Sequence, residues 1–163
     1  MSPYIAIVQA QFNPLITNEL TRGAIEELKQ NGFSKDQVEV IEVPGAFEIP
    51  ATVSAILRHK QFKAIICIGA VIRGETSHYD IVAGECASGI ADLSQKSPIP
   101  IIFGVLTTEN ADQALARCGI KGPNHGALAA KSAIDMIKVL QKIKSSNNQT
   151  EKRSHGASIN SDT

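Results

Sequence analysis

Four short runs of apolar residues divide the chain, and within each run the apolar residues are nearly continuous. The runs are rich in Ile, Val and Ala and occupy Tyr4–Val8, Val38–Val43, Ala64–Ile72 and Ile101–Leu106. Continuous apolar runs of this length are typical of parallel strands whose two faces are both covered by other elements. The pattern therefore predicts four buried strands.

Between these runs, apolar residues recur with helical spacing. One stripe covers Leu15–Leu28 and stops at the pair Asn31-Gly32, and a second apolar segment follows Pro50, a residue suited to a first helical turn. Strands that alternate with helices predict right-handed βαβ units and a three-layer α/β sandwich around a parallel four-stranded sheet. Further helices are expected to begin near His78, to begin near Asn110, and to span about Ala127 to Ile143.

The last part of the chain differs in composition. Residues 145–163, "SSNNQTEKRSHGASINSDT", contain one large aliphatic residue, Ile159, and are otherwise polar or small. Such a segment cannot bury enough apolar surface to offset its chain entropy. We therefore predict one α/β domain over residues 1–144 and a disordered polar tail over residues 145–163.

Composition excludes several classes of function. Sixteen basic and sixteen acidic residues cancel among the 163, so no excess charge points to nucleic acid or to an anionic membrane as a partner. No apolar run approaches the roughly 20 residues of a membrane span, and the N-terminus lacks the features of a signal peptide. The three cysteines, Cys67, Cys86 and Cys118, show neither disulfide nor metal-ligand spacing. We interpret them as packed, reduced thiols and expect a cytoplasmic protein.

Aromatic and polar residues follow the predicted strands, where parallel sheets bind ligands. Phe12 and Asn13 follow the first strand, and Ala46, Phe47 and Glu48 follow the second. Either phenylalanine alone would more often fill a core. Two aromatics and a carboxylate at strand ends, in a chain with 4% aromatic residues, predict a site for a flat, polar molecule.

The loop after the third strand, within "GAVIRGETSHYDIVAGE", differs from a phosphate-binding P-loop at one position, because Glu75 stands where the lysine would be. Without that lysine, nucleotide hydrolysis is disfavoured. Gly74 would allow a close turn, and the backbone amides of Glu75, Thr76 and Ser77 at a helix start would bind an anion. An ordinary capped turn fits the same spacing equally well.

His78 is expected in the first turn of the next helix, with Ser77 and Asp80 as its capping pair. There the helix dipole favours neutral imidazole, whereas a bound phosphate favours imidazolium, so the ring could exchange a proton with a ligand. A lone histidine is nevertheless more often structural. Arg117, at the end of the fourth helix, could cap that helix or bind phosphate, and His125 could be solvated or line a site.

Five segments resemble the lumazine synthase family in order and spacing: "FNPLIT", "VPGAFEIP", "GAVIRGETSHYDIV", "IPIIFGVLTTEN" and "NHGALAAKSAIDMI". The resemblance covers about Ile5 to Leu140. It implies a flavodoxin-like, doubly wound fold and the condensation of 5-amino-6-(D-ribitylamino)uracil with 3,4-dihydroxy-2-butanone 4-phosphate. Phosphate and water are released in this penultimate step of riboflavin biosynthesis, with no metal or organic cofactor. The resemblance also implies homopentamers with sites shared between subunits, and leaves open a decamer or a sixty-subunit shell.

The same resemblance assigns roles to individual residues. It makes His78 the catalytic proton donor and acceptor, and it takes two of the binding residues, Phe103 and Arg117, from a neighbouring subunit. Glu75, Thr76 and Arg117 would bind the phosphate. The pyrimidine would be bound by Phe12, Ala46, Phe47, Glu48, Ala70, Val71, Ile72 and Phe103.

Three positions depart from the family pattern. Gln11 replaces a frequent arginine, Pro123 replaces a glycine usual in shell-forming members, and His125 replaces a frequent lysine, so that any help from position 125 in phosphate binding becomes pH-dependent. Two other functions stay open from the sequence. One is a non-catalytic flavin- or lumazine-binding or storage assembly of the same fold, and the other is a nucleotide-binding regulator.

Overall fold

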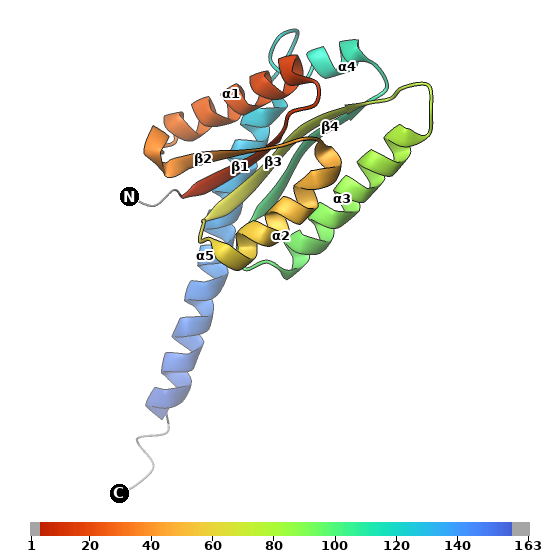
Figure 1. Cartoon of the computed structure of the whole chain (residues 1–163). Helices are drawn as coiled ribbons and strands as arrows, with labels where there is room; N and C mark the ends of the chain where they lie inside the picture. Colours follow the sequence, from red (N-terminus) through yellow and green to blue (C-terminus); the bar gives the residue numbers. More distant parts are fainter. Residues whose placement is uncertain (1–3, 158–163) are drawn as a thin grey trace, which may run out of the picture.

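The computed structural model describes residues 4–157, except for the side chains of 155–157, and contains a parallel four-stranded sheet. The strands lie in the order β2-β1-β3-β4 (Figure 1). The sheet confirms the predicted parallel arrangement. Its strands are β1 (Ile5–Ala10), β2 (Val38–Val43), β3 (Ala64–Ile72) and β4 (Ile101–Thr108).

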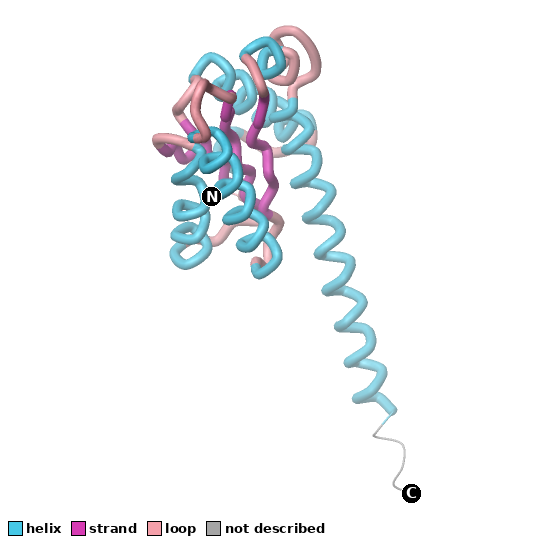
Figure 2. Tube along the Cα trace, turned by 90° about the vertical axis from the view of Figure 1, so that its right-hand side faces the viewer, coloured by secondary structure: helices cyan, strands magenta, loops and turns pink. Residues whose placement is uncertain are grey.

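Helices cover both faces of the sheet and complete the predicted three-layer α/β sandwich. Helices α1 and α5 pack against one face, and α2 and α3 against the other (Figures 1 and 2). The helices are α1 (Pro14–Gln30), α2 (Ile49–His59), α3 (His78–Lys96), α4 (Ala111–Leu115) and α5 (His125–Ala157), with short 3-10 turns η1 (Lys35–Gln37) and η2 (Ala46–Glu48).

The near-continuous apolar strands follow from this double coverage. Ile7 and Ile66 point into the core beneath α1 and α5, whereas the adjacent Val8 and Cys67 point into the core beneath α2 and α3. Each isoleucine so buried contributes roughly 1.5–3 kcal/mol relative to exposure. The residues that face either side of the sheet are therefore apolar, and these strands lack the apolar–polar alternation of a half-exposed strand.

The sheet extends further than the sequence predicts. Strand β1 runs to Ala10 and β4 to Thr108, in each case two residues past the expected end. The extra residues stay in the ladder, since Ala10 pairs with Val43 and Thr108 pairs with Ile72. Polar Gln9 and Thr108 are buried in these extensions, so hydropathy alone could not find the strand ends.

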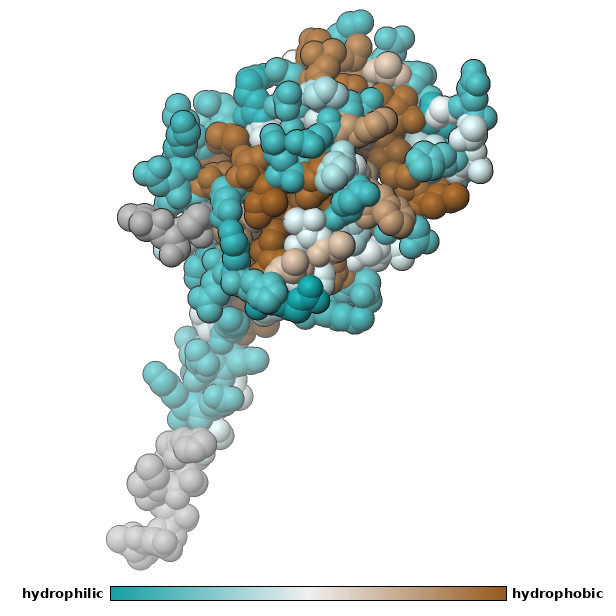
Figure 3. All heavy atoms as spheres, viewed as in Figure 1, coloured by the Kyte–Doolittle hydropathy of each residue, from teal (hydrophilic) through white to brown (hydrophobic). Residues whose placement is uncertain are grey.

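Helix α5 also exceeds its expected range. It begins at His125 and continues to Ala157, so residues 145–157, expected to be disordered, are helical, while 158–163 lie outside the described residues. The helix projects from the body (Figure 2), and its projecting part carries hydrophilic side chains (Figure 3). Once the packed half provides the nucleus, each further residue adds a hydrogen bond at little extra cost. The hydroxyls of Ser145 and Ser146 donate to carbonyls one turn earlier. Among residues 4–157, no helix has the length and apolarity to cross a bilayer.

Candidate functional site

The loop after β1 turns Phe12 out to solvent. Asn13 adopts the left-handed conformation (φ 58, ψ 59), which asparagine tolerates better than most residues. Its side-chain amide donates to the carbonyl of Ala70 at 2.8 Å, so this loop is fastened to the end of β3. Phe12 is 72% exposed and therefore does not fill the core.

The loop after β2 lies beside it. The backbone N–H of Gln11 donates to the carbonyl of Val43 at 2.8 Å, and its side-chain amide donates to Glu42 at 3.1 Å. The 3-10 turn η2 then presents Phe47, 53% exposed, next to the exposed Glu48. Ala46 is buried beneath them. The alternative that Phe12 and Phe47 fill the core is therefore wrong.

The loop after β3 leads directly into α3, which begins at His78 as the sequence predicts. The capping pair, however, is not formed: the side chain of Ser77 makes no capping hydrogen bond. Instead the backbone N–H of His78 donates to Thr76 Oγ1 at 3.3 Å, and the carboxylate of Asp80 accepts from Arg73. Among residues 4–154, no hydrogen bond or ion pair engages the exposed ring of His78, which leaves it available to a ligand.

Gly74 is not required by the backbone. Its φ lies outside the left-handed region, and a Cβ added there would meet nothing within 4 Å. Gly74 allows the turn, as expected, but another residue could adopt the same backbone conformation.

Arg73, which sequence reasoning missed, organises this loop. Its Nε donates to Glu109 at 2.7 Å and its Nη1 donates to Asp80 at 3.2 Å. The guanidinium carbon lies 4.3 Å from the centroid of the Tyr79 ring. The hydrogen bond to Glu109, followed by the charges of Asp80 and Glu109, raises the pKa of Arg73 and keeps it cationic.

The remaining predicted residues form a separate group. Phe103, on the free edge of β4, is 44% exposed and lines a hollow of ≈ 190 Å³ together with His125. Arg117 donates from Nη1 to the carbonyl of Gln113 at 2.9 Å, the capping role considered from the sequence, and its own carbonyl accepts from the backbone N–H of His125 at 2.8 Å. Phe103, Arg117 and His125 thus share one side of the molecule.

The two groups are not joined within one chain. The first contains Phe12, Phe47, Glu48 and the Glu75–His78 turn, and the second contains Phe103, Arg117 and His125. In the part of the chain that the structure describes, no hydrogen bond or ion pair links a member of one group to a member of the other. At the end of β3, Ala70 already accepts from Asn13, while Val71 and Ile72 pair with Thr107 and Thr108.

Asn124 fixes the loop that carries the second group. Its side-chain amide donates to the carbonyl of Glu19 in α1 at 2.8 Å and to that of Cys118 at 2.9 Å. Its Oδ1 accepts from the backbone N–H of Ala127 at 3.0 Å and so caps α5. A Cβ at Gly23 would overlap this side chain. No local motif in the sequence signals this three-way contact.

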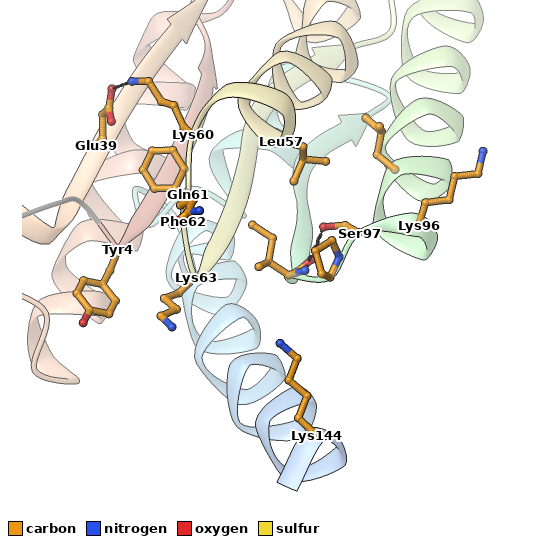
Figure 4. Close-up of a pocket in the computed structure, with 13 residues that line it drawn as sticks. Tyr4, Glu39, Leu57, Lys60, Gln61, Phe62, Lys63, Lys96, Ser97 and Lys144 are labelled. Atoms are coloured by element: carbon orange, nitrogen blue, oxygen red, sulfur yellow. Dashed lines mark hydrogen bonds and ion pairs between the residues drawn. The ribbon is translucent and has the colours of Figure 1, made fainter. Parts of the chain in front are cut away.

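A larger hollow lies at the opposite end of the sheet. It measures ≈ 980 Å³ and is lined by Tyr4 and Phe62, which precede β1 and β3, and by residues of neighbouring helices, including Lys144 of α5 (Figure 4). Within it, Lys60 is paired with Glu39 at 2.9 Å. It contains none of the predicted site residues, so the candidate site is the surface at the carboxyl ends of the strands.

The cysteines are packed as expected. Cys67, Cys86 and Cys118 are all free and buried. Burial raises the pKa of Cys67, with a smaller contribution from neighbouring Cys86, and burial raises the pKa of Cys86 to about 11. Among residues 4–157, no cluster of three His, Cys, Asp or Glu side chains could hold a metal ion.

Residues 2–141 match the family model described as 6,7-dimethyl-8-ribityllumazine synthase. The chain belongs to this family. A 6,7-dimethyl-8-ribityllumazine synthase from Sodalis glossinidius (strain morsitans) is 48% identical over 141 residues, which cover 86% of this chain and 90% of the relative. The resemblance found in the sequence is thereby confirmed, as is the predicted activity: a lumazine synthase, a transferase of riboflavin biosynthesis. A non-catalytic storage assembly is not favoured.

Proposed function

We propose that this chain condenses 5-amino-6-(D-ribitylamino)uracil with 3,4-dihydroxy-2-butanone 4-phosphate at the carboxyl ends of β1, β2 and β3. The observation that carries this proposal is the pairing of two outward-facing phenylalanines with an unengaged histidine at a helix start. Phe12 and Phe47 are more than half exposed. His78, the first residue of α3, is also exposed.

The pyrimidine is assigned to the loops after β1 and β2 and to the end of β3. Phe12 would stack on the ring, Glu48 would accept from the ribityl hydroxyls, and Ala46 and Phe47 would border the ring. Ala70, Val71 and Ile72 would offer backbone groups to the ring edge, since the Ala70 carbonyl keeps a second lone pair beside its bond to Asn13. Phe103, on the edge of β4, would close the pocket from a second subunit.

The phosphate is assigned to the turn at Glu75 and Thr76. Backbone amides at the start of the 19-residue helix α3 meet the positive end of its dipole, and this combination favours a phosphate without a metal or other cofactor. Arg117 of a second subunit would add a cation, with His125 beside it. His78 would move protons between the substrates as the imine forms and phosphate leaves.

Two effects account for catalysis. Holding both substrates together removes up to about 7–11 kcal/mol of barrier in ideal cases. Proton transfer by His78 adds roughly 10²–10⁴-fold in rate. Proximity thus lowers the barrier more than proton transfer does, which suits a site with a single proton-transfer group.

The proposed assembly accounts for the two separate groups. A complete site would need the Phe12–His78 group of one subunit and the Phe103–Arg117 group of another, as in a homopentamer with shared sites. The 44% exposed Phe103 on the free edge of β4 supports such a contact. The buried free thiols suit the reducing cytoplasm, where we expect the enzyme to act.

A direct assay tests this proposal. The purified chain is mixed with both substrates, and lumazine absorbance and fluorescence are followed against a protein-free reaction. We expect protein-dependent product that saturates in each substrate. The same assay is run on His78→Ala. Its matched control is His59→Ala, since His59 lies at the exposed end of α2, remote from the strand ends that bear the site. A folded sample that does not accelerate product formation would contradict the proposal.

A further inference from the structure

The exposed turn between β3 and α3 is held by one side chain that bridges across it. Arg73 comes immediately before residues 74–78, whereas Tyr79 and Asp80 come immediately after them. The guanidinium donates to Asp80 at 3.2 Å and lies over the Tyr79 ring at 4.3 Å. Both ends of the turn are therefore gathered at the same guanidinium.

The bridge is anchored to the sheet as well. The backbone N–H of Arg73 donates to the carbonyl of Thr108 at 2.8 Å, and Nε donates to Glu109 at 2.7 Å. Thr108 is the last residue of β4 and Glu109 follows it. Arg73 thus connects the exits of two neighbouring strands to the first turn of α3.

The other hydrogen bonds of this turn lie at its helical end, where the Ser77 carbonyl accepts from the backbone N–H of Asp80 at 3.0 Å. Ser77 makes no side-chain cap, and the 3.3 Å contact from the His78 N–H to Thr76 is long for a hydrogen bond. All five residues from 74 to 78 are exposed, so packing does not hold them either. The position of the backbone amides and of His78 consequently depends on what holds the two ends.

We propose that Arg73 is a positioning residue, which sets the geometry of the Glu75–His78 turn for phosphate binding without touching the substrate. This inference rests on the proposed role of that turn. Two carboxylates, Glu109 and Asp80, already accept from the guanidinium, so its charge is engaged within the protein. The task needs arginine in particular, since a lysine ammonium cannot serve two carboxylates from a planar fork and stack on a ring at once.

The test compares Arg73→Lys with a matched control, Arg22→Lys. Arg22 is an exposed arginine of α1 that also donates twice to a carboxylate, at 3.0 Å and 2.7 Å to Glu19, far from the turn in sequence. Because small misplacements of a binding group are costly, Arg73→Lys should lower kcat/KM for the butanone phosphate by roughly 10- to 100-fold. KM for the pyrimidine and the unfolding temperature should stay near those of Arg22→Lys.

A second variant separates positioning from direct contact. Glu109→Gln removes the negative charge of one partner of the guanidinium and leaves a side-chain oxygen that can still accept. If Arg73 positions the turn, inhibition by inorganic phosphate weakens in Glu109→Gln, and the effects of Glu109→Gln and Arg73→Lys are less than additive. If Arg73 is itself a phosphate ligand, the less neutralised cation makes inorganic phosphate a stronger inhibitor, and that result would overturn the inference.

The remaining outcomes are also decisive. Unchanged kinetics in Arg73→Lys, or equal losses for both substrates with a lowered unfolding temperature, would each reject the positioning role while leaving the proposed function intact. The unmodified protein tests that function separately, through turnover and through competition between inorganic phosphate and the butanone phosphate. Failure of either would overturn the proposed phosphate turn and this inference with it.

Discussion

Replacing Asn124 by alanine should lower the free energy of unfolding more than replacing any other asparagine described above. The substitution removes three hydrogen bonds, of 2.8, 2.9 and 3.0 Å, and leaves the carbonyls of Glu19 and Cys118 without that donor. A typical intramolecular hydrogen bond contributes about 0.5–1.5 kcal/mol net, so the three together are worth roughly 1.5–4.5 kcal/mol. Asn124 is half-buried, so water can replace part of the hydrogen bonding that is lost. We therefore expect a loss of about 2–3 kcal/mol.

Urea unfolding followed by far-UV circular dichroism measures this loss. The midpoint should fall while the slope m stays constant, since the surface exposed on unfolding hardly changes. Protein concentration must be held fixed, because assembly contributes to apparent stability. In the same variant, KM for the butanone phosphate should rise, because the loop that Asn124 fixes carries Arg117 and His125.

Asn110→Ala is the matched control. The Asn110 side chain accepts one hydrogen bond, from the backbone N–H of Gln113 at 2.9 Å, and caps the short helix α4. Loss of such a cap costs about 1 kcal/mol. If Asn124→Ala costs no more than Asn110→Ala, the reasoning that Asn124 joins three segments is refuted.

Three further outcomes are expected. His78→Ala should retain turnover above the protein-free rate, because proximity supplies most of the barrier reduction, and total loss in an intact assembly would reject that ranking. Arg117→Ala should raise KM for the butanone phosphate far more than KM for the pyrimidine; equal increases would argue against a phosphate contact. Burial raises the pKa of Cys86 from 9.0 to about 11, so the folded state holds this proton more tightly than the unfolded chain does, and the associated stability is complete below about pH 9 and lost as pH rises towards 11. The free energy of unfolding should fall across that window, less steeply in Cys86→Ala, and identical slopes would exclude the thiol as a cause.

The sheet could be predicted because its signal is local. Ile5, Ile7, Ile65 and Ile66 are apolar whichever face they point to, and a parallel strand covered on both sides requires nothing else. Phe12 and Phe47 could also be predicted as site residues, because the prediction depended on their position after a strand and not on whether they are buried.

The contacts that organise the site could not be predicted, since they join residues far apart in the chain. Asn124 meets Glu19 across 105 positions, and Arg73 meets Glu109 across 36. The capping pair fails for a different reason, since the competing group, Arg73, is only seven residues from Asp80. Asp80 has the right spacing from Ser77, but a cation at 3.2 Å offers its carboxylate a charge-assisted partner. A spacing rule cannot include that competitor.

The projecting helix has a practical consequence. At a rise of about 1.5 Å per residue, the 33 residues of α5 extend for roughly 50 Å. The helix begins at His125 and passes Lys144, beside the hollow at the amino ends of the strands, before it leaves the body (Figures 1 and 4). It is thus a built-in spacer that points away from the carboxyl-end loops. A fluorescent protein or an antigen fused beyond Ala157 would be carried clear of those loops, which makes this end the natural attachment point for labelling or display.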